Sequence, residues 1–176
     1  MVKEYFEKLS QLWMGPVGFF EQDSSHSSEK DALQFAVITS LLVALELGIA
    51  EALSGESLGM VALVTLLMLF GMPFLFAGWV YLWASFIKLC GNLMGENLSL
   101  QPVRRVVAYS AAGFAALGVG FGLGKWLALA VFVFQVFGIE KSLRCSRWTA
   151  LIYVGLPFSL VAVLAVFFTL MFKVFK

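Results

Sequence analysis

The chain begins with a stretch in which apolar and polar residues alternate with the period of a helix. Its apolar residues recur every three or four positions, and they are Val2, Tyr5, Phe6, Leu9, Leu12 and Trp13. This pattern predicts an amphipathic helix lying on a surface, either the bilayer interface, which Trp and Tyr favour, or the cytoplasmic side of a helix bundle. Gly15 and Pro16 are expected to end this helix, because proline disfavours helical geometry in the residue before it.

A short apolar anchor over residues 17–20 and a polar linker over residues 21–31 are expected next. Within the linker, Ser28 and Asp31 have the three-residue spacing of a helix-capping pair. A helix is therefore predicted to start at the end of the linker.

Five apolar segments follow, and each is expected to be a transmembrane helix. They cover residues 32–53, 58–90, 106–123, 126–139 and 148–172. About 20 apolar residues cross the ~30 Å of hydrocarbon in a bilayer. The predicted fold is an all-α integral membrane protein, in which residues 1–31 form a cytoplasmic amphipathic helix and linker and residues 32–176 form a five-helix transmembrane bundle.

Two of these segments have an unusual length. The second would be about 50 Å long as one helix, so it is either a single span bent at Pro73 or two short spans broken at residues 71–73. The fourth has only 14 apolar residues, so it is buried in the bundle, extends past Glu140, or belongs to a re-entrant pair. In the last segment, Pro157 predicts a kink.

The distribution of Lys and Arg decides how the second segment is read, since cytoplasmic loops are enriched in both residues. With one span there, nine basic residues fall on the side of the amino terminus, namely Lys3, Lys8, Lys30, Lys88, Arg104, Arg105, Lys141, Arg144 and Arg147. Three fall on the other side, namely Lys125, Lys173 and Lys176. Two spans would divide them six to six, so a single bent span with a cytoplasmic amino terminus is predicted.

Composition agrees with a membrane protein and argues against several other classes. Hydrophobic residues make up 61% of the chain and charged residues 13%, and the mean hydropathy is +0.92. A net charge of +1 gives no basic field that would attract nucleic acid. Cys90, Cys145 and His26 have no metal-ligand spacing, and no nucleophile–base arrangement is visible, so no metal, cofactor or enzymatic activity is expected.

Three polar residues within the apolar segments are candidates for function, namely Glu46, Glu51 and Gln135. Glu46 lies near the middle of the first segment, where an acid costs several kcal/mol unless it is paired or hydrated. It either titrates or contacts a ligand inside the bundle, or it locks the packing by bonding to Gln135, a Ser or a Thr. Glu51 lies nearer the outer end, and an ion pair with Lys125 is expected there.

Small residues recur every fourth position around the third segment. The set expected to allow close helix packing comprises Ala112, Ala116, Gly118, Gly120, Gly122 and Gly124. No strand precedes this glycine run, so a nucleotide-binding loop is excluded. A second group, the basic collar, comprises Lys88, Arg104, Arg105, Lys141, Arg144 and Arg147, and it is expected to fix the orientation of the chain and to contact anionic lipids or an acidic partner.

Several landmarks resemble the Yip family, the Ypt/Rab-interacting membrane proteins, and in particular its short prokaryotic members. They are the apolar-aromatic run at residues 13–20, Tyr109–Ser110 in the third span, residues 137–139, and residues 146–150 at the start of the last span. The resemblance implies five spans, a cytoplasmic amino terminus and no enzymatic activity. Family members that bind Rab proteins carry Asp-Leu-x-Gly-Pro, whereas this chain has Leu12 and Trp13 before Gly15–Pro16, so no Rab-binding residues are carried over.

The expected function is therefore that of a non-enzymatic organiser of membranes or partner proteins, of a trafficking type, in the cytoplasmic membrane of a prokaryote. Its expected partners are membrane lipids and either another protein or a second copy of the chain. The alternative is a small transporter or channel in which Glu46 and Gln135 line a pathway bent at Pro73 and Pro157.

Overall fold

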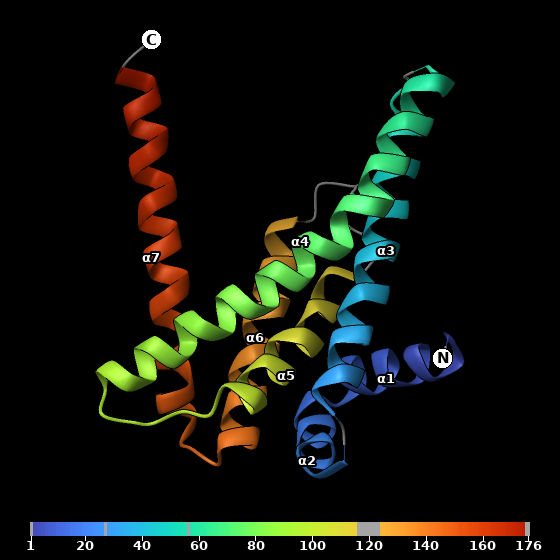
Figure 1. Cartoon of the computed structure of the whole chain (residues 1–176). Helices are drawn as coiled ribbons and strands as arrows, with labels where there is room; N and C mark the ends of the chain where they lie inside the picture. The colour runs from blue at the N-terminus through green and yellow to red at the C-terminus, as the bar shows by residue number, and fades with distance from the viewer. Residues whose placement is uncertain (1, 27, 56, 116–123, 175–176) are drawn as a thin grey trace.

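The computed structural model describes residues 2–26, 28–55, 57–115 and 124–174, and these residues form an all-helical structure (Figure 1). The helices are α1 (Val2–Met14), α2 (Pro16–His26), α3 (Glu29–Leu53), α4 (Leu58–Leu93), α5 (Leu100–Ser110), the 3-10 helix η1 (Ala111–Ala115), α6 (Gly124–Leu143) and α7 (Arg147–Val174).

Within the part of the chain that the structure describes, three helices are long and apolar enough to cross a bilayer. They are α3, α4 and α7, the last over Arg147–Leu164. Their apolar side chains also face outward, since Phe70 and Phe74 on α4 and Leu160 and Phe167 on α7 are exposed. Because water would make such a surface aggregate, the chain is a multi-pass membrane protein. The count of five spans remains a prediction, because the described residues of α5 and α6 do not meet the same criterion.

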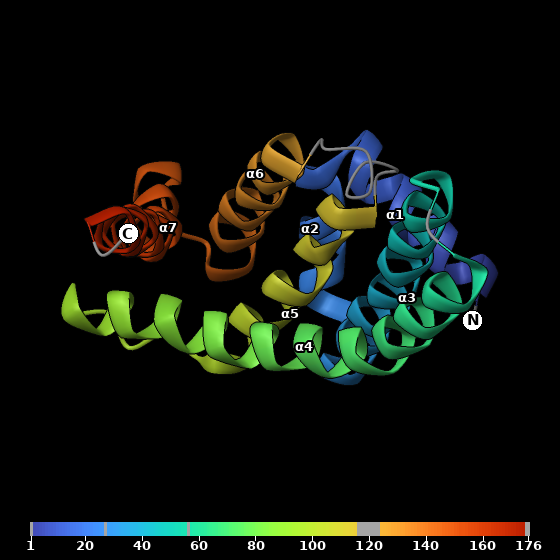
Figure 2. The ribbon, with the colours of Figure 1, turned by 90° about the horizontal axis from the view of Figure 1, so that it is seen from above.

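The long apolar run over residues 58–90 forms the single helix α4, with Pro73 inside it. Figure 1 shows the first part of α4 beside α3, and its second part running across the molecule toward α7. Seen from above, α4 occupies one side of the molecule from α3 to α7 (Figure 2). The sequence-based choice of one bent helix is thus confirmed.

The amino-terminal region differs in part from the prediction. α1 ends at Met14 and α2 begins at Pro16, as the Gly15–Pro16 pair predicts. The expected anchor and linker are instead largely the helix α2, which packs against α6. Proline is favourable in the first helical turn, where its missing N–H has no partner to lose. The predicted capping pair is confirmed, since Ser28 and Asp31 each accept a hydrogen bond from the other's backbone N–H at 3.2 Å.

The third and fourth apolar segments also differ from their predicted bounds. α5 begins at Leu100, well before residue 106, and its α-helix ends at Ser110. Residues 116–123 of the predicted third span lie outside the described residues. α6 extends past Glu140 to Leu143, which is one of the alternatives left open by its short apolar run.

The termini of the long helices lie at two opposite ends of the molecule. The connection from α4 to α5 and the connection from α6 to α7 lie at one end, and the end of α3, the start of α4 and the end of α7 lie at the other (Figure 1). Arg104 lies in the first half of α5, and Arg144 directly follows α6. α5 and α6 lie between these elements and carry much of the core, including Val103, Val107 and Ile139.

Candidate functional sites

The face of α3 turned toward α1 carries the buried acid Glu46. Phe35, Thr39, Val43 and Glu46 recur at helical spacing and are all buried. Tyr5 of α1 packs on this face, because its ring lies 4.7 Å from the ring of Phe35 and its hydroxyl lies 3.0 Å from that of Thr39. Thr39 uses its own hydrogen to bond the Phe35 carbonyl at 3.0 Å, so Tyr5 donates to Thr39.

The environment of the Tyr5 hydroxyl connects it to Glu46. Burial raises the pKa of Tyr5, the bond to Thr39 opposes that rise, and the charge of Glu46 raises the pKa further. Tyr5 is therefore a neutral donor at physiological pH. It joins α1 to the same face of α3 that carries the intramembrane acid.

Gln135 on α6 is fully buried and uses both ends of its amide. Its oxygen accepts a hydrogen bond from the Trp83 indole at 2.8 Å, and its nitrogen donates to the Ser110 hydroxyl at 3.2 Å. Ser110 in turn donates to the Val107 carbonyl at 2.7 Å. This network joins α4, α5 and α6. It includes Gln135, which the sequence suggested as a bonding partner for Glu46.

Glu51 is exposed near the end of α3. Its proposed ion pair with Lys125 is not tested, because the Lys125 side chain lies outside the described residues. Cys90 and Cys145 are separate free cysteines, and in the described part of the chain no group of three His, Cys, Asp or Glu residues is placed to hold a metal ion.

The small-residue set is described only in part. Ala112 is fully buried, and its carbonyl accepts a hydrogen bond from the Trp13 indole at 3.3 Å. Gly124 begins α6, while Ala116, Gly118, Gly120 and Gly122 lie outside the described residues. Gly113, which the small-residue set did not include, makes a close contact, since a Cβ there would lie 2.9 Å from the backbone nitrogen of Val131. The approach of η1 to α6 therefore depends on a residue without a side chain.

Members of the basic collar pair with acids from other helices, which joins the helix ends together. Three ion pairs connect Arg104 to Glu29 at 2.9 Å, Lys141 to Glu21 at 2.7 Å, and Arg147 to Glu140 at 2.8 Å. They link α5 to α3, α6 to α2, and α7 to α6. Arg104 also stacks on the Tyr81 ring at 4.8 Å. Arg105 is partly buried, Lys88 is partly exposed on α4, and Arg144 is exposed with a φ of 52° at the end of α6.

The Glu140–Arg147 ion pair also changes the pKa of the Glu140 carboxyl. The hydrogen bonds from Arg147 lower the pKa of the Glu140 carboxyl below its usual value. The carboxylate is therefore fully charged at neutral pH, and it ties the end of α6 to the start of α7.

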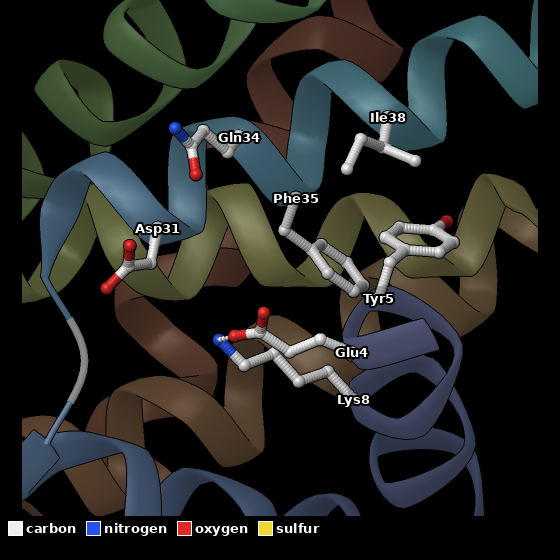
Figure 3. Close-up of a pocket in the computed structure, with 7 residues that line it drawn as sticks. All are labelled: Glu4, Tyr5, Lys8, Asp31, Gln34, Phe35 and Ile38. Atoms are coloured by element: carbon white, nitrogen blue, oxygen red, sulfur yellow. Dashed lines mark ion pairs between the residues drawn. The ribbon is translucent and has the colours of Figure 1, made fainter. Parts of the chain in front are cut away.

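A pocket lies between α1 and α3 (Figure 3). α1 contributes Glu4, Tyr5 and Lys8, and α3 contributes Asp31, Gln34, Phe35 and Ile38. Lys8 and Glu4 form an ion pair at 3.6 Å, and the Lys8 ammonium also lies 5.9 Å from the centre of the Tyr109 ring. Sequence reasoning missed this pocket, because the residues that form it are about 30 positions apart and no local spacing connects them.

No protein-family model, curated protein or solved structure matches the chain.

Proposed function

We propose that this chain is a non-enzymatic membrane protein that organises lipids or partner proteins, in the manner expected from its resemblance to the Yip family. The observation that supports this proposal most is the bonding inside the bundle. Gln135, Ser110 and Trp83 satisfy one another's polar groups among packed apolar side chains. A scaffold needs such a closed interior, whereas a transport pathway needs polar groups that face water.

The contact surface proposed for a partner is the outward face of α1. Lys3, Glu7, Ser10 and Gln11 are exposed there beside the half-exposed Phe6. The opposite face of α1 is occupied, since Tyr5 and Leu12 are buried against the bundle. A partner therefore meets a mixed charged and aromatic helix face.

Site-specific cross-linking in cells tests this proposal. A photoreactive residue is placed at Glu7 or at Gln11, and the control position is Leu160 on α7, which is exposed on a candidate membrane span. The proposal expects the same protein adduct from both α1 positions and only lipid adducts from Leu160. Identical adducts from all three positions, or no protein adduct from α1, would contradict a protein partner at the outward face of α1.

A small transporter or channel is the second candidate, and the burial of Glu46 within a candidate span favours it. Purified protein in liposomes distinguishes the two functions. Flux of protons, ions or solutes that disappears in a Glu46→Gln variant, but persists in a Glu51→Gln variant, would establish the transporter. Equal and negligible flux in all three proteins would favour the organiser.

A further inference from the structure

α1 contacts α3 and α6 at a similar depth in the molecule. Figure 1 shows α1 running across the lower part of α3. Tyr5 packs on Phe35, about 9 Å along α3 from Glu29 at its start. Near the other end of α1, the Trp13 ring lies 5.1 Å from the ring of Phe134, which is about 14 Å from the end of α6. α1 therefore lies on the flank of the bundle, level with the first turns of α3 and the last turns of α6.

The polar end of α3 indicates where this level lies in a bilayer. Glu29 at the start of α3 forms an ion pair with Arg104 at 2.9 Å, and charged side chains at the end of a span belong in water or among the headgroups. The headgroups occupy about 5–8 Å on each side of the hydrocarbon. Phe35, about 9 Å further along the candidate span α3, is then at the edge of the hydrocarbon. α1 packs on Phe35, so it lies at the boundary between headgroups and acyl chains.

The contact of Tyr5 with α3 fixes the rotation of α1 about its own axis. Successive residues of a helix are turned by about 100°, so Glu4 and Phe6 lie on opposite sides of Tyr5. Glu4 and Lys8 extend toward the end of α3 that carries Asp31 (Figure 3), and the charge of Lys8 acts on the Asp31 carboxyl. Phe6 therefore faces the other way, toward the carboxyl end of α3 and the interior of the bilayer.

The side of α1 that faces the bilayer interior is apolar and exposed. Phe6 and Trp13 are 51% and 42% exposed. They lie two helical turns apart on one line, which gives an aromatic edge about 10 Å long. The Trp13 indole N–H donates to the Ala112 carbonyl at 3.3 Å, so its polar atom is satisfied within the protein. An aromatic surface of this kind is favourable at the level of the headgroups and unfavourable in water.

The remaining side of α1 is polar. Lys3 and Glu7 form an ion pair at 3.8 Å, and both side chains are more than half exposed. Gln11 is also exposed. Helices that lie in the plane of a membrane interface combine an apolar side among the acyl chains with a charged side among the headgroups. α1 has both, together with a third side that is buried against the bundle.

We propose that α1 is an interfacial helix in the leaflet at the amino-terminal end of α3, and that the aromatic edge of Phe6 and Trp13 contacts the acyl chains of that leaflet. The partner of this edge is the lipid surface itself, while Lys3 and Glu7 lie among the headgroups. The contact does not depend on the protein partner proposed for the outward face of α1. A partner protein would reach that face from the water.

Spin labels on α1 test the proposal in the full-length protein reconstituted into liposomes. A single cysteine replaces Phe6 or Gln11 in a background without Cys90 and Cys145, and each carries a nitroxide. Collisions with oxygen, which concentrates among acyl chains, are compared with collisions with a water-soluble nickel chelate. The label at position 6 should report a depth of about 5–10 Å below the headgroups. The label at position 11 should lie at the headgroups or in water.

Two reference positions calibrate the measurement. Leu160 is exposed on the candidate span α7, and Asn97 is exposed in the connection between α4 and α5. Position 6 should resemble the label at Leu160, and position 11 the label at Asn97. Equal exposure of positions 6 and 11 to the nickel chelate would place the whole of α1 in water and would overturn the proposal.

Matched variants test the aromatic edge without a label on α1. Lipids that carry a photoreactive group in the acyl chain should modify α1 of the wild-type protein in liposomes. Phe6→Asp should remove most of this modification, whereas Gln11→Asp should leave it unchanged, and circular dichroism checks that both variants are folded. Each variant adds one negative charge to α1, so equal loss in both would show an effect of charge alone and would refute the edge. Because the protein is purified, these results do not depend on whether a protein partner exists.

Discussion

Among single residues, Trp83 and Gln135 form a hydrogen bond whose contribution to the stability of the bundle can be measured directly. A Trp83→Phe substitution leaves the Gln135 oxygen buried without its donor, which costs about 1–3 kcal/mol. The thermal midpoint in detergent should fall accordingly. Trp148→Phe is the matched control, because Trp148 is 78% exposed whereas Trp83 is 7% exposed. Equal effects of the two substitutions would show that the Trp83–Gln135 bond adds no stability.

Single residues also show where sequence reasoning succeeds and where it stops. Glu46 could be identified from the sequence because it is an acid within an apolar segment, and it is buried in the structure. Tyr5, Trp83 and Gly113 gave no such signal, since an aromatic residue or a glycine is common in apolar segments. Their roles arise from contacts with Thr39, Gln135 and Val131, which lie 18 to 52 positions away in the chain.

At the scale of helices, the ion pair between Glu140 and Arg147 predicts a pH-dependent contact between α6 and α7. The pKa of Glu140 is lowered in the folded state from an unfolded value of 4.5, so the stabilisation is present above pH 4.5 and is lost as the pH falls through the folded-state pKa. The contribution is small, because Arg147 is more than half exposed and solvent screens the ion pair.

The measurement compares thermal midpoints between pH 7 and pH 3.5 for the wild-type protein and for Glu140→Gln. The variant should lose less stability on acidification than the wild type. Glu51→Gln, which changes an exposed glutamate on α3, should retain the wild-type response. Parallel acid responses of all three proteins would exclude a contribution from the Glu140–Arg147 pair.

Helix bounds could be predicted where a local signal was strong. The Ser28–Asp31 cap fixes the start of α3, Gly15–Pro16 separates α1 from α2, and charge asymmetry selects the single helix α4. α2 was missed because residues 21–26 are polar and have no apolar period, and its packing on α6 is a tertiary effect. The predicted start of α5 was too late in the chain, because Arg104 and Arg105 interrupt the apolar run. In the structure Val103, Val106 and Val107 are buried on one face of this helix.

At the scale of the whole molecule, the arrangement of the helix ends predicts the topology. Single cysteines at Gln101 and at Ser146 should react with an impermeant thiol reagent only from the cytoplasmic side, in a background with Cys90 and Cys145 replaced. A cysteine at Ser54, in the turn between α3 and α4, should react only from the outside. Labelling of Gln101 and Ser146 from opposite sides would overturn the topology.

The continuity of α4 has a consequence for the way the protein responds to its bilayer. A helix of 36 residues is about 54 Å long, far more than the ~30 Å of hydrocarbon, so it must lie obliquely. A thinner bilayer increases that inclination. Since α4 packs on α3 over its first part and on α5 and α7 over its second, the same tilt displaces α7 relative to α3. We therefore expect the separation of α3 and α7 to change with the thickness of the bilayer.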